Sequence, residues 1–373
     1  MKMRKFFLVA SIAMIICILT ACMGTGADNE KDADTNAVRL DGTVTLHYKK
    51  KQRGMASIGF YRTNDESAGT LELEVSGGIL TIPEEIDGMP VAWLDESAFI
   101  DQSFSDITVK ELVIPASVLE IDRKAFNSGL ESLESYKVAE GNNCYYAKDG
   151  VIYSIGSMDR DRRILLHYPS GKTDESFTIP GDIYGIFEWA FCENDYIRDI
   201  VIAEGVEAIS GDAFHNCSAL ERVSFPASLT STGYDGKGGN LFEGCFSLKE
   251  VNVDAANTVL FDDGGVLYSN DKLICYPAGK TDAEYIVREG TKRIGDEAFF
   301  RNSSLEKVTC PTGLTHIYNY GFASCDALKT IIIDLGGNAY DSIYIDTNVF
   351  SGTEDNDGFS VCDTAGNVLY APK

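Results

Sequence analysis

The sequence of 373 residues contains few of the side chains that build catalytic or metal centres. None of its four histidines lies in an HExxH or HxxxH pair, and it has no CxxC pair and no GxSxG segment. The common motifs for zinc sites, redox thiols and serine nucleophiles are therefore missing. We interpret the chain as a non-enzymatic protein without a cofactor or metal. Each histidine is expected at the surface or at the edge of a structural unit: His47, His167, His215 and His316.

Basic residues are also scarce. The chain has 32 Lys and Arg against 57 Asp and Glu, which gives a formal net charge of −25. Such a charge opposes binding to the phosphates of nucleic acid and to anionic lipid headgroups. We expect no nucleic-acid partner.

Two segments, YPSGKT (168–173) and YPAGKT (276–281), end like a phosphate-binding loop but lack its first glycine. Leu166 and Ile274 stand where that glycine would let the backbone curl around phosphates. The Pro-x-Gly in each copy is typical of a surface turn. We therefore expect a repeated turn and no nucleotide, and the 108-residue spacing of the copies indicates a duplication.

The N-terminus has the pattern of an export signal. Basic residues precede a short apolar stretch from Phe6 to Leu19, which is too short to favour a membrane span. The stretch ends in LTAC, which resembles the lipobox of bacterial lipoproteins and implies cleavage after Ala21 and lipidation of Cys22. The alternative is an ordinary signal peptide with an incidental cysteine. We assign 1–21 as the signal peptide and the polar segment 22–36 as a flexible acidic tether.

An Ala-Phe pair, or a weaker version of it, closes one unit of the sequence after another. Short spacings between these phenylalanines are 23 to 28 residues, the range of leucine-rich repeats. The repeat phenylalanines are Phe99, Phe126, Phe191, Phe214, Phe242, Phe299, Phe322 and Phe350.

After each phenylalanine comes an L-x-x-V-x-I pattern, as in Leu220, Val223 and Phe225. Its last two apolar positions have the period of a strand with one buried face. One unit cannot bury its apolar side alone, so we expect a β-rich leucine-rich-repeat solenoid over 71–333. A parallel sheet forms one face, and short helical or irregular segments form the other. Cys217, Cys245 and Cys325 lie three residues after a repeat phenylalanine, which indicates a position for a small buried residue and not a nucleophile.

The long gaps between repeats hold a second module. YYAKDGVIYS…RRILLHYPSGKT and LFDDGGVLYSNDKLICYPAGKT each contain two apolar strands and predict two inserted β-hairpins. Residues 37–70 alternate like strands and are expected to form an N-terminal cap. Residues 334–373 lose the repeat and are expected to form a C-terminal cap.

Together, the IP…I…AF…C..L..V.IP pattern, the inserted hairpin and the lipobox resemble the BspA-like leucine-rich-repeat surface proteins of bacteria. The resemblance covers ~71–333 and implies a lipid-anchored cell-surface protein that binds host or microbial macromolecules. Its implied partners are an extracellular protein or polysaccharide of the host or of neighbouring bacteria, and the membrane through the N-terminal lipid. The pattern departs at 231–241, where the isoleucine and the alanine of the Ala-Phe pair are missing.

Two further features bear on function. The acidic run 353–364 lacks the carboxylates that a calcium loop needs at its first and twelfth positions, so a solvated turn is expected. On the strands, the outward residues form a row that predicts a flat binding surface, although a solvated face laced with ion pairs stays open as the alternative. The inserted hairpins are a rival location, and a cell-surface hydrolase or an accessory polysaccharide-binding protein is the alternative function. The predicted row is Glu111, Lys137, Asp199, Arg222, Glu250 and Lys307.

Overall fold

The computed structural model describes residues 39–51, 54–59, 68–127, 129–156, 162–233 and 241–372. The predicted signal peptide, the tether and Cys22 lie outside the described residues. The N-terminal cap and the segment 231–241 are described only in part. In the described part no helix is both long and apolar enough to cross a membrane.

A sheet with nine strands begins the described chain and joins the expected cap to the first repeats. The long strands β1 (Gly42–Lys50) and β3 (Ala68–Ser76) pair antiparallel, and β3 turns back through β4 (Ile79–Thr81) onto the first repeat strand. The strand pattern expected for 37–70 is therefore present. The other strands of this sheet are β2 (Ala56–Ile58), β5 (Glu85–Ile86), β6 (Met89–Leu94), β7 (Glu111–Ile114), β8 (Glu120–Ile121) and β9 (Ser135–Val138).

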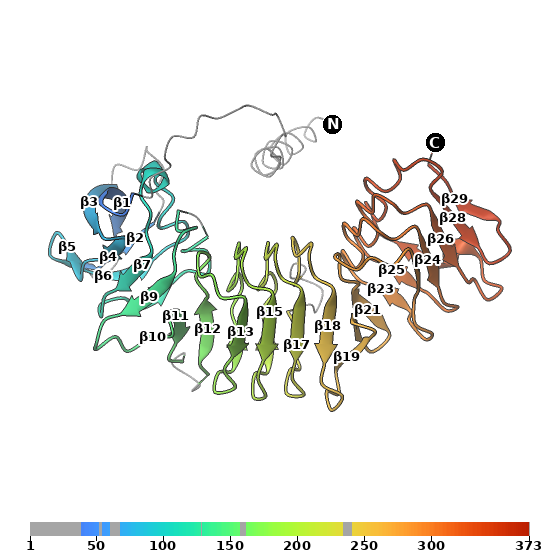
Figure 1. The fold of residues 1–373 in the computed structure, drawn as a ribbon, viewed down its shortest axis with the longest axis horizontal. Coiled ribbons are helices and arrows are strands. Elements are labelled where there is room, and N and C mark those ends of the chain that lie inside the picture. Colours follow the sequence, from blue (N-terminus) through green and yellow to red (C-terminus); the bar gives the residue numbers. More distant parts are fainter. Residues whose placement is uncertain are drawn as a thin grey trace, which may run out of the picture. The chain divides into compact units, whose positions relative to one another are not determined.

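Each L-x-x-V-x-I pattern forms a four-residue strand. Within each of three sheets, these strands pair parallel from one coil, meaning one repeat of the chain, to the next (Figure 1). We call the surface that they form the strand face. Parallel pairing follows because every repeat brings the chain back in the same direction, one coil further along. Beyond β7 and β9, the strand face consists of β13 (Ser176–Ile179), β15 (Asp199–Ile202), β17 (Arg222–Phe225), β18 (Glu250–Val253), β22 (Glu284–Ile286), β24 (Lys307–Cys310), β26 (Thr330–Ile333) and β28 (Ser360–Asp363).

The opposite wall of the coils consists of turns, which agree with the irregular segments expected there, and of short strands that were not expected. Two-residue strands pair parallel through isoleucines such as Ile209 and Ile317, whose side chains are buried. The 3₁₀ helices wholly within the described residues are short: η2 (Gln102–Asp106) and η3 (Tyr340–Ser342). The short wall strands are β14 (Gly185–Ile186), β16 (Ala208–Ile209), β23 (Arg293–Ile294), β25 (His316–Ile317) and β27 (Tyr344–Ile345).

Two antiparallel segments occupy the long gaps between repeats, and the last strand of each pairs parallel with a short strand of the second wall. In the second segment, Asn270 and Asp271 alone separate two paired strands, as the sequence SND predicts. The first segment is β10 (Tyr145–Lys148), β11 (Val151–Ser154) and β12 (Ile164–His167), and the second is β19 (Leu260–Asp263), β20 (Val266–Ser269) and β21 (Lys272–Cys275).

The repeat phenylalanines are buried and stack on one another between the two walls. The rings of Phe214 and Phe242 are stacked with centroids 5.7 Å apart, and those of Phe299 and Phe322 are 4.7 Å apart. Tyr168 continues one column by stacking on Phe191 at 5.0 Å, and the equivalent Tyr276 stacks on Phe299 at 5.2 Å. The tyrosine of each Tyr-Pro-x-Gly-Lys segment thus substitutes for a repeat phenylalanine where a coil is interrupted.

Both walls continue beyond residue 333, into the expected C-terminal cap. Strand β28 pairs parallel with β26, and β27 pairs parallel with β25. Strand β29 (Val368–Tyr370) then turns back antiparallel on β28 and covers the edge of the last sheet. Covering this edge leaves fewer free hydrogen-bonding groups for pairing with another chain.

Candidate functional site

The strand face carries the row of residues that the sequence predicts for binding. Alternate side chains of each strand point into the core or away from it: in β17, Val223 and Phe225 are buried whereas Arg222 is exposed. The six predicted residues all occupy outward positions on their strands: Glu111, Lys137, Asp199, Arg222, Glu250 and Lys307.

The sequence predicts that these residues form one row. In the structure they do not lie on one continuous ladder of paired strands. Asp199, Arg222 and Glu250 are register partners on neighbouring strands of one four-stranded sheet. Glu111 and Lys137 lie in the N-terminal sheet, and Lys307 lies in the last sheet. The row is therefore three separate groups.

The antiparallel segments cause this division. The backbone N–H of Tyr136 in β9 donates to the carbonyl oxygen of Gly150, at 2.8 Å from nitrogen to oxygen. In the same way, the N–H of Val251 in β18 donates to Gly265 at 2.9 Å. The inserted segment thus takes up the hydrogen-bonding edge on which the next repeat strand would pair.

Ion pairs link outward residues of neighbouring coils. Arg222 Nε lies 2.5 Å from Asp199 Oδ1, and this carboxylate raises the pKa of the Arg222 guanidinium. Lys137 Nζ lies 2.8 Å from Glu111 Oε1 in the first group, and Lys307 Nζ lies 3.0 Å from Glu284 Oε2 in the last.

A second line of ion pairs runs along the residues that precede these strands. Glu221 accepts from Lys249 Nζ at 2.8 Å and from Arg198 Nη1 at 2.9 Å, and both contacts lower the pKa of its carboxyl group. The charges of the strand face are therefore largely neutralised in pairs. This pattern agrees with the alternative that the face is only a solvated surface with ion pairs. A partner that binds here would have to break these ion pairs and form new ones with the same side chains.

Apolar side chains accompany the charges at the next outward position of several strands. Val201 in β15 is 45% exposed and Ile286 in β22 is 74% exposed. Ile286 pairs across the sheet with Thr309, which pairs with Ile332. In the last sheet, β-branched side chains thus lie beside the charged outward positions of the strand face.

The two Gly-Lys-Thr segments are turns against the preceding coil. The N–H of Gly171 donates to the carbonyl of Leu133 at 2.8 Å, and that of Gly279 donates to Leu248 at 2.7 Å. A Cβ atom on either glycine would lie about 2.5 Å from backbone atoms of the neighbouring coil, which no side chain permits. The glycine is thus required by close packing, and Lys172 beside it pairs with Asp174 at 2.9 Å.

His167 is buried, which corrects the expectation of a surface or edge position. Its Nδ1 is 2.8 Å from the hydroxyl of Tyr136, and burial lowers the pKa of its imidazole to about 3. The sequence did not predict this because His167 ends the apolar strand β12. This strand lies outside the repeat pattern, so no alternation shows which of its side chains point into the core. His47 and His316 are partly exposed and contact Asp101 and Thr315.

Cys217, Cys245 and Cys325 are buried, as their place in the repeat predicts. Each thiol donates to the carbonyl oxygen of a phenylalanine in the preceding coil, with sulfur–oxygen distances of 3.0 to 3.1 Å. Burial raises the pKa of the Cys325 thiol to about 12, which disfavours the nucleophilic thiolate. At the equivalent Gly129, an added Cβ would lie 1.8 Å from the carbonyl oxygen of Phe99, which explains the demand for small residues. The cysteines within the described residues are free thiols.

The first residue of the acidic run is not available as a ligand. Thr353 is fully buried; its hydroxyl donates to the carbonyl of Phe322 and accepts from the N–H of Cys325. This arrangement agrees with the expected turn.

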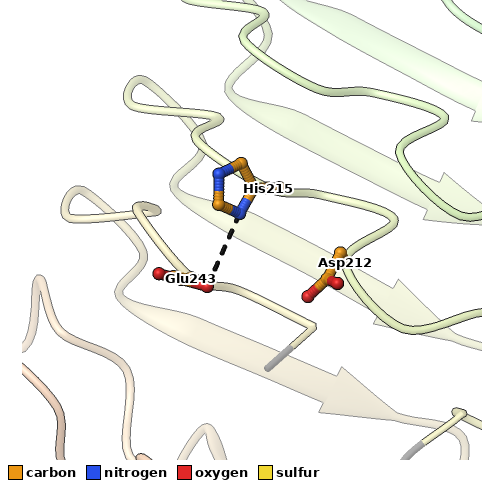
Figure 2. Close-up of side chains that lie close together, drawn as sticks. All are labelled: Asp212, His215 and Glu243. Atoms are coloured by element: carbon orange, nitrogen blue, oxygen red, sulfur yellow. Dashed lines mark ion pairs between the residues drawn. The ribbon is translucent and has the colours of Figure 1, made fainter. Parts of the chain in front are cut away.

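Three ligand-type side chains that the sequence analysis did not bring together lie side by side at the end of two neighbouring coils (Figure 2). Asp212 and His215 flank Phe214, and Glu243 follows the next repeat phenylalanine. One ligand atom from each lies within 4.8 Å of the others. The repeat itself contained the signal, because His215 and Glu243 each directly follow a repeat phenylalanine and so occupy equivalent places in stacked coils.

An open cavity of about 550 Å³ lies beside the second wall, in front of β21 and β23. Its lining is mostly polar, and Arg293 there pairs with Asp271. Residues that line it include Thr230, Ser231, Lys272, Arg293, Asp296 and Tyr318.

These repeats match a known family. The model of the BspA type leucine-rich-repeat region matches residues 170–263 and 281–364, in six copies. Over these residues the chain consists of BspA-type leucine-rich repeats. The BspA-type repeats contain all the strands of the strand face from β15 onward and the Asp212, His215 and Glu243 cluster.

Among solved structures, the chain is similar to a leucine-rich repeat protein from Eubacterium ventriosum, with 28% identity, a TM-score of 0.46, and coverage of 66% of this chain and 59% of that one. It is also similar to the pneumococcal vaccine antigen PcpA, with 21% identity, a TM-score of 0.49, and coverage of 87% and 82%. A leucine rich cell surface protein from Faecalibacterium prausnitzii has 17% identity and a TM-score of 0.46, with coverage of 91% and 96%. No curated protein matches the chain.

Proposed function

We propose that this chain is a bacterial cell-surface protein that binds an extracellular macromolecule, most simply a protein, through the strand face. In this proposal the BspA-type coils form one solenoid, the antiparallel segments are inserted β-hairpins, and the chain is a binding protein and not an enzyme. The family supports it, since surface interaction or adhesion is what BspA-like repeats suggest.

One observation carries the choice of surface. In the central group, Asp199, Arg222 and Glu250 are in register on adjacent parallel strands beside the exposed Val201. Parallel strands lie about 5 Å apart, so the face is flat and presents its charges at a regular spacing. Flat, regular and extended surfaces fit another macromolecule, whereas small molecules are bound in concave pockets.

We further propose that the mature chain is anchored to the membrane by lipid on Cys22, which keeps the coils at the cell surface. A multiply acylated cysteine gives stable anchoring, which a single acyl chain does not. Mass spectrometry of the native protein is expected to find a lipidated N-terminus at Cys22, and Cys22→Ala is expected to release the protein from membranes. An intact Met1, or a soluble unmodified mature form, would contradict the anchor.

The partner can be sought by capture from host extracellular material and from the surfaces of neighbouring bacteria. We expect a captured protein that is lost with the charge reversals Arg222→Glu, Glu250→Lys and Lys307→Glu. The matched control reverses Lys51, Arg163 and Asp182, which changes the net charge equally but lies off the strand face. Equal capture by both variants would contradict binding at the strand face.

The cavity beside the second wall favours a second candidate, an accessory polysaccharide-binding protein. Its lining combines hydroxyl, carboxylate and guanidinium groups with the ring of Tyr318, which are groups that bind sugar hydroxyls and sugar faces. A glycan array with the wild type and Tyr318→Ala tests it: binding lost in Tyr318→Ala and kept in the strand-face variant would favour this candidate.

A further inference from the structure

Two features of the Asp212, His215 and Glu243 cluster set it apart from an ordinary polar corner. Among the residues that the structure describes, His215 Nδ1 and Asp212 Oδ1 are both shielded from solvent and have no hydrogen-bond partner. The nearest Glu243 oxygen lies 3.6 Å from His215 Nδ1, which is too long for a hydrogen bond. Buried polar atoms are nearly always paired, so two unpaired atoms facing one space need an explanation.

The backbone holds the cluster in place. The carbonyl of His215 accepts from the N–H of Glu193 at 3.0 Å, and the carbonyl of Glu243 accepts from the N–H of Asn216 at 2.7 Å. These bonds link three successive coils, so the three side chains project from a scaffold that is fixed by repeat stacking. The ring of Trp189 closes one side, with its centroid 4.6 Å from that of His215.

This combination of side chains occurs at this pair of neighbouring coils and is not repeated in the coils around it. The corresponding residues one coil earlier are Trp189 and Cys192. In the coils after Glu243, the residues that directly follow Tyr276 and Phe299 are Pro277 and Phe300. Other coils therefore lack this set of donors, and the cluster is not a requirement of the repeat.

We propose that Asp212, His215 and Glu243 bind a divalent transition-metal ion, with Zn²⁺ as the best-matched ion. An imidazole nitrogen with two carboxylate oxygens suits Zn²⁺ and its neighbours in the transition series, whereas Ca²⁺ and Mg²⁺ take oxygen ligands. The two carboxylates neutralise the ion, and a bound ion satisfies both unpaired atoms. Bonds of about 2 Å require the ligand atoms to approach one another slightly.

The site fits a structural role with an accessible face. Asp212 and His215 come from one coil and Glu243 from the next, so the ion joins two neighbouring coils. The His215 side chain is 17% exposed and that of Glu243 is 42% exposed, which leaves a side open for entry and for a water ligand.

The test uses the full chain and Zn²⁺ alone, followed by equilibrium dialysis and thermal unfolding. We expect about one Zn²⁺ bound per chain and a higher melting temperature with Zn²⁺. Both effects should be lost in His215→Ala and in Glu243→Gln. The matched control is His316→Ala, which removes a partly exposed histidine from the second wall and should keep both effects. No Zn²⁺ bound by the wild type, or equal binding by all variants, would overturn the site.

A second measurement shows where the metal binds. It does not depend on the folding of variants in which a metal ligand is replaced. The chain has two tryptophans, Trp93 and Trp189, so Trp93→Phe leaves a single tryptophan beside the cluster. Binding of Co²⁺ or Cu²⁺ at the cluster should quench most of its fluorescence, and excess Zn²⁺ should restore it. Zn²⁺ binding without this quenching would place the metal elsewhere and overturn the assignment.

Discussion

The thiol of Cys217 donates to the carbonyl oxygen of Phe191 in the preceding coil, with 3.1 Å between sulfur and oxygen. Thr353 makes the same contact from its hydroxyl to Phe322 at 2.6 Å, so a small side chain that donates one hydrogen bond can link two coils at this position. The cysteine there is therefore a linker between coils, and its chemistry as a nucleophile is suppressed by burial.

We expect Cys217→Ala to lower the free energy of unfolding by about 1 kcal/mol, the usual net value of one hydrogen bond. Cys217→Leu should cost several times more, because the extra atoms must displace the Phe191 backbone. Urea denaturation measures both. Equal losses for Ala and Leu would mean that the position is not tightly packed.

The stacked phenylalanines should contribute most of the stability of each coil. Phe214 is fully buried between Phe191 and Phe242, so we expect Phe214→Ala to cost ~3–5 kcal/mol, as large-to-small core changes do. The control is Phe246→Ala, which truncates an exposed phenylalanine only four residues beyond Phe242. Similar melting temperatures for the two variants would contradict the assigned repeat register.

Burial of neutral His167 should make stability depend on pH in one direction. Its pKa is about 3 in the folded chain and about 6.5 in an unfolded chain. Between these values the unfolded chain binds a proton that the folded chain does not, so the free energy of unfolding falls as the pH is lowered.

This stabilisation is fully present above pH ~6.5 and is lost at up to about 1.4 kcal/mol per pH unit below it. We expect His167→Gln to reduce the slope of stability against pH between 6 and 4, measured by urea denaturation. His316→Gln, at a partly exposed position, should leave the slope unchanged. A slope that is the same in all three proteins would contradict a buried neutral His167.

Charge reversal on the strand face should separate binding from stability. Exposed ion pairs such as Arg222 with Asp199 contribute little to stability, because water and salt screen them. We therefore expect the combined change Arg222→Glu, Glu250→Lys and Lys307→Glu to abolish binding of the proposed partner with little change in melting temperature. Because these residues lie in two of the three groups, reversing Arg222 and Glu250 alone shows whether the central group suffices.

The inserted turn is the rival site for the same partner. The segment 155–163 is seven residues longer than its counterpart in the second copy, and the matched variant shortens it to that length. If only the shortened variant loses the partner, the strand-face assignment is wrong.

Much of the fold could be predicted from residue order alone, because each repeat contacts mainly its neighbours. The spacing from Phe214 to Phe242 and the period-two pattern in Val223 and Phe225 predicted which side chains are buried and which strands pair. The small-residue position at Cys217 was predicted for the same reason. In a stack of similar coils, equivalent positions become neighbours, so sequence periodicity is already spatial information.

Only the tertiary structure decided where the pairing between coils is interrupted and which side chains come into contact at the ends of the coils. The pairing of Tyr136 with Gly150 divides the strand face into three groups, and no local pattern shows which edge an inserted segment will occupy. His167 is buried because Phe126 and Tyr136 pack around its ring, and those residues lie 31 or more positions away in sequence. The repeat makes His215 and Glu243 equivalent in neighbouring coils, but the approach of Asp212 to both depends on the exact offset between the coils, which backbone hydrogen bonds set.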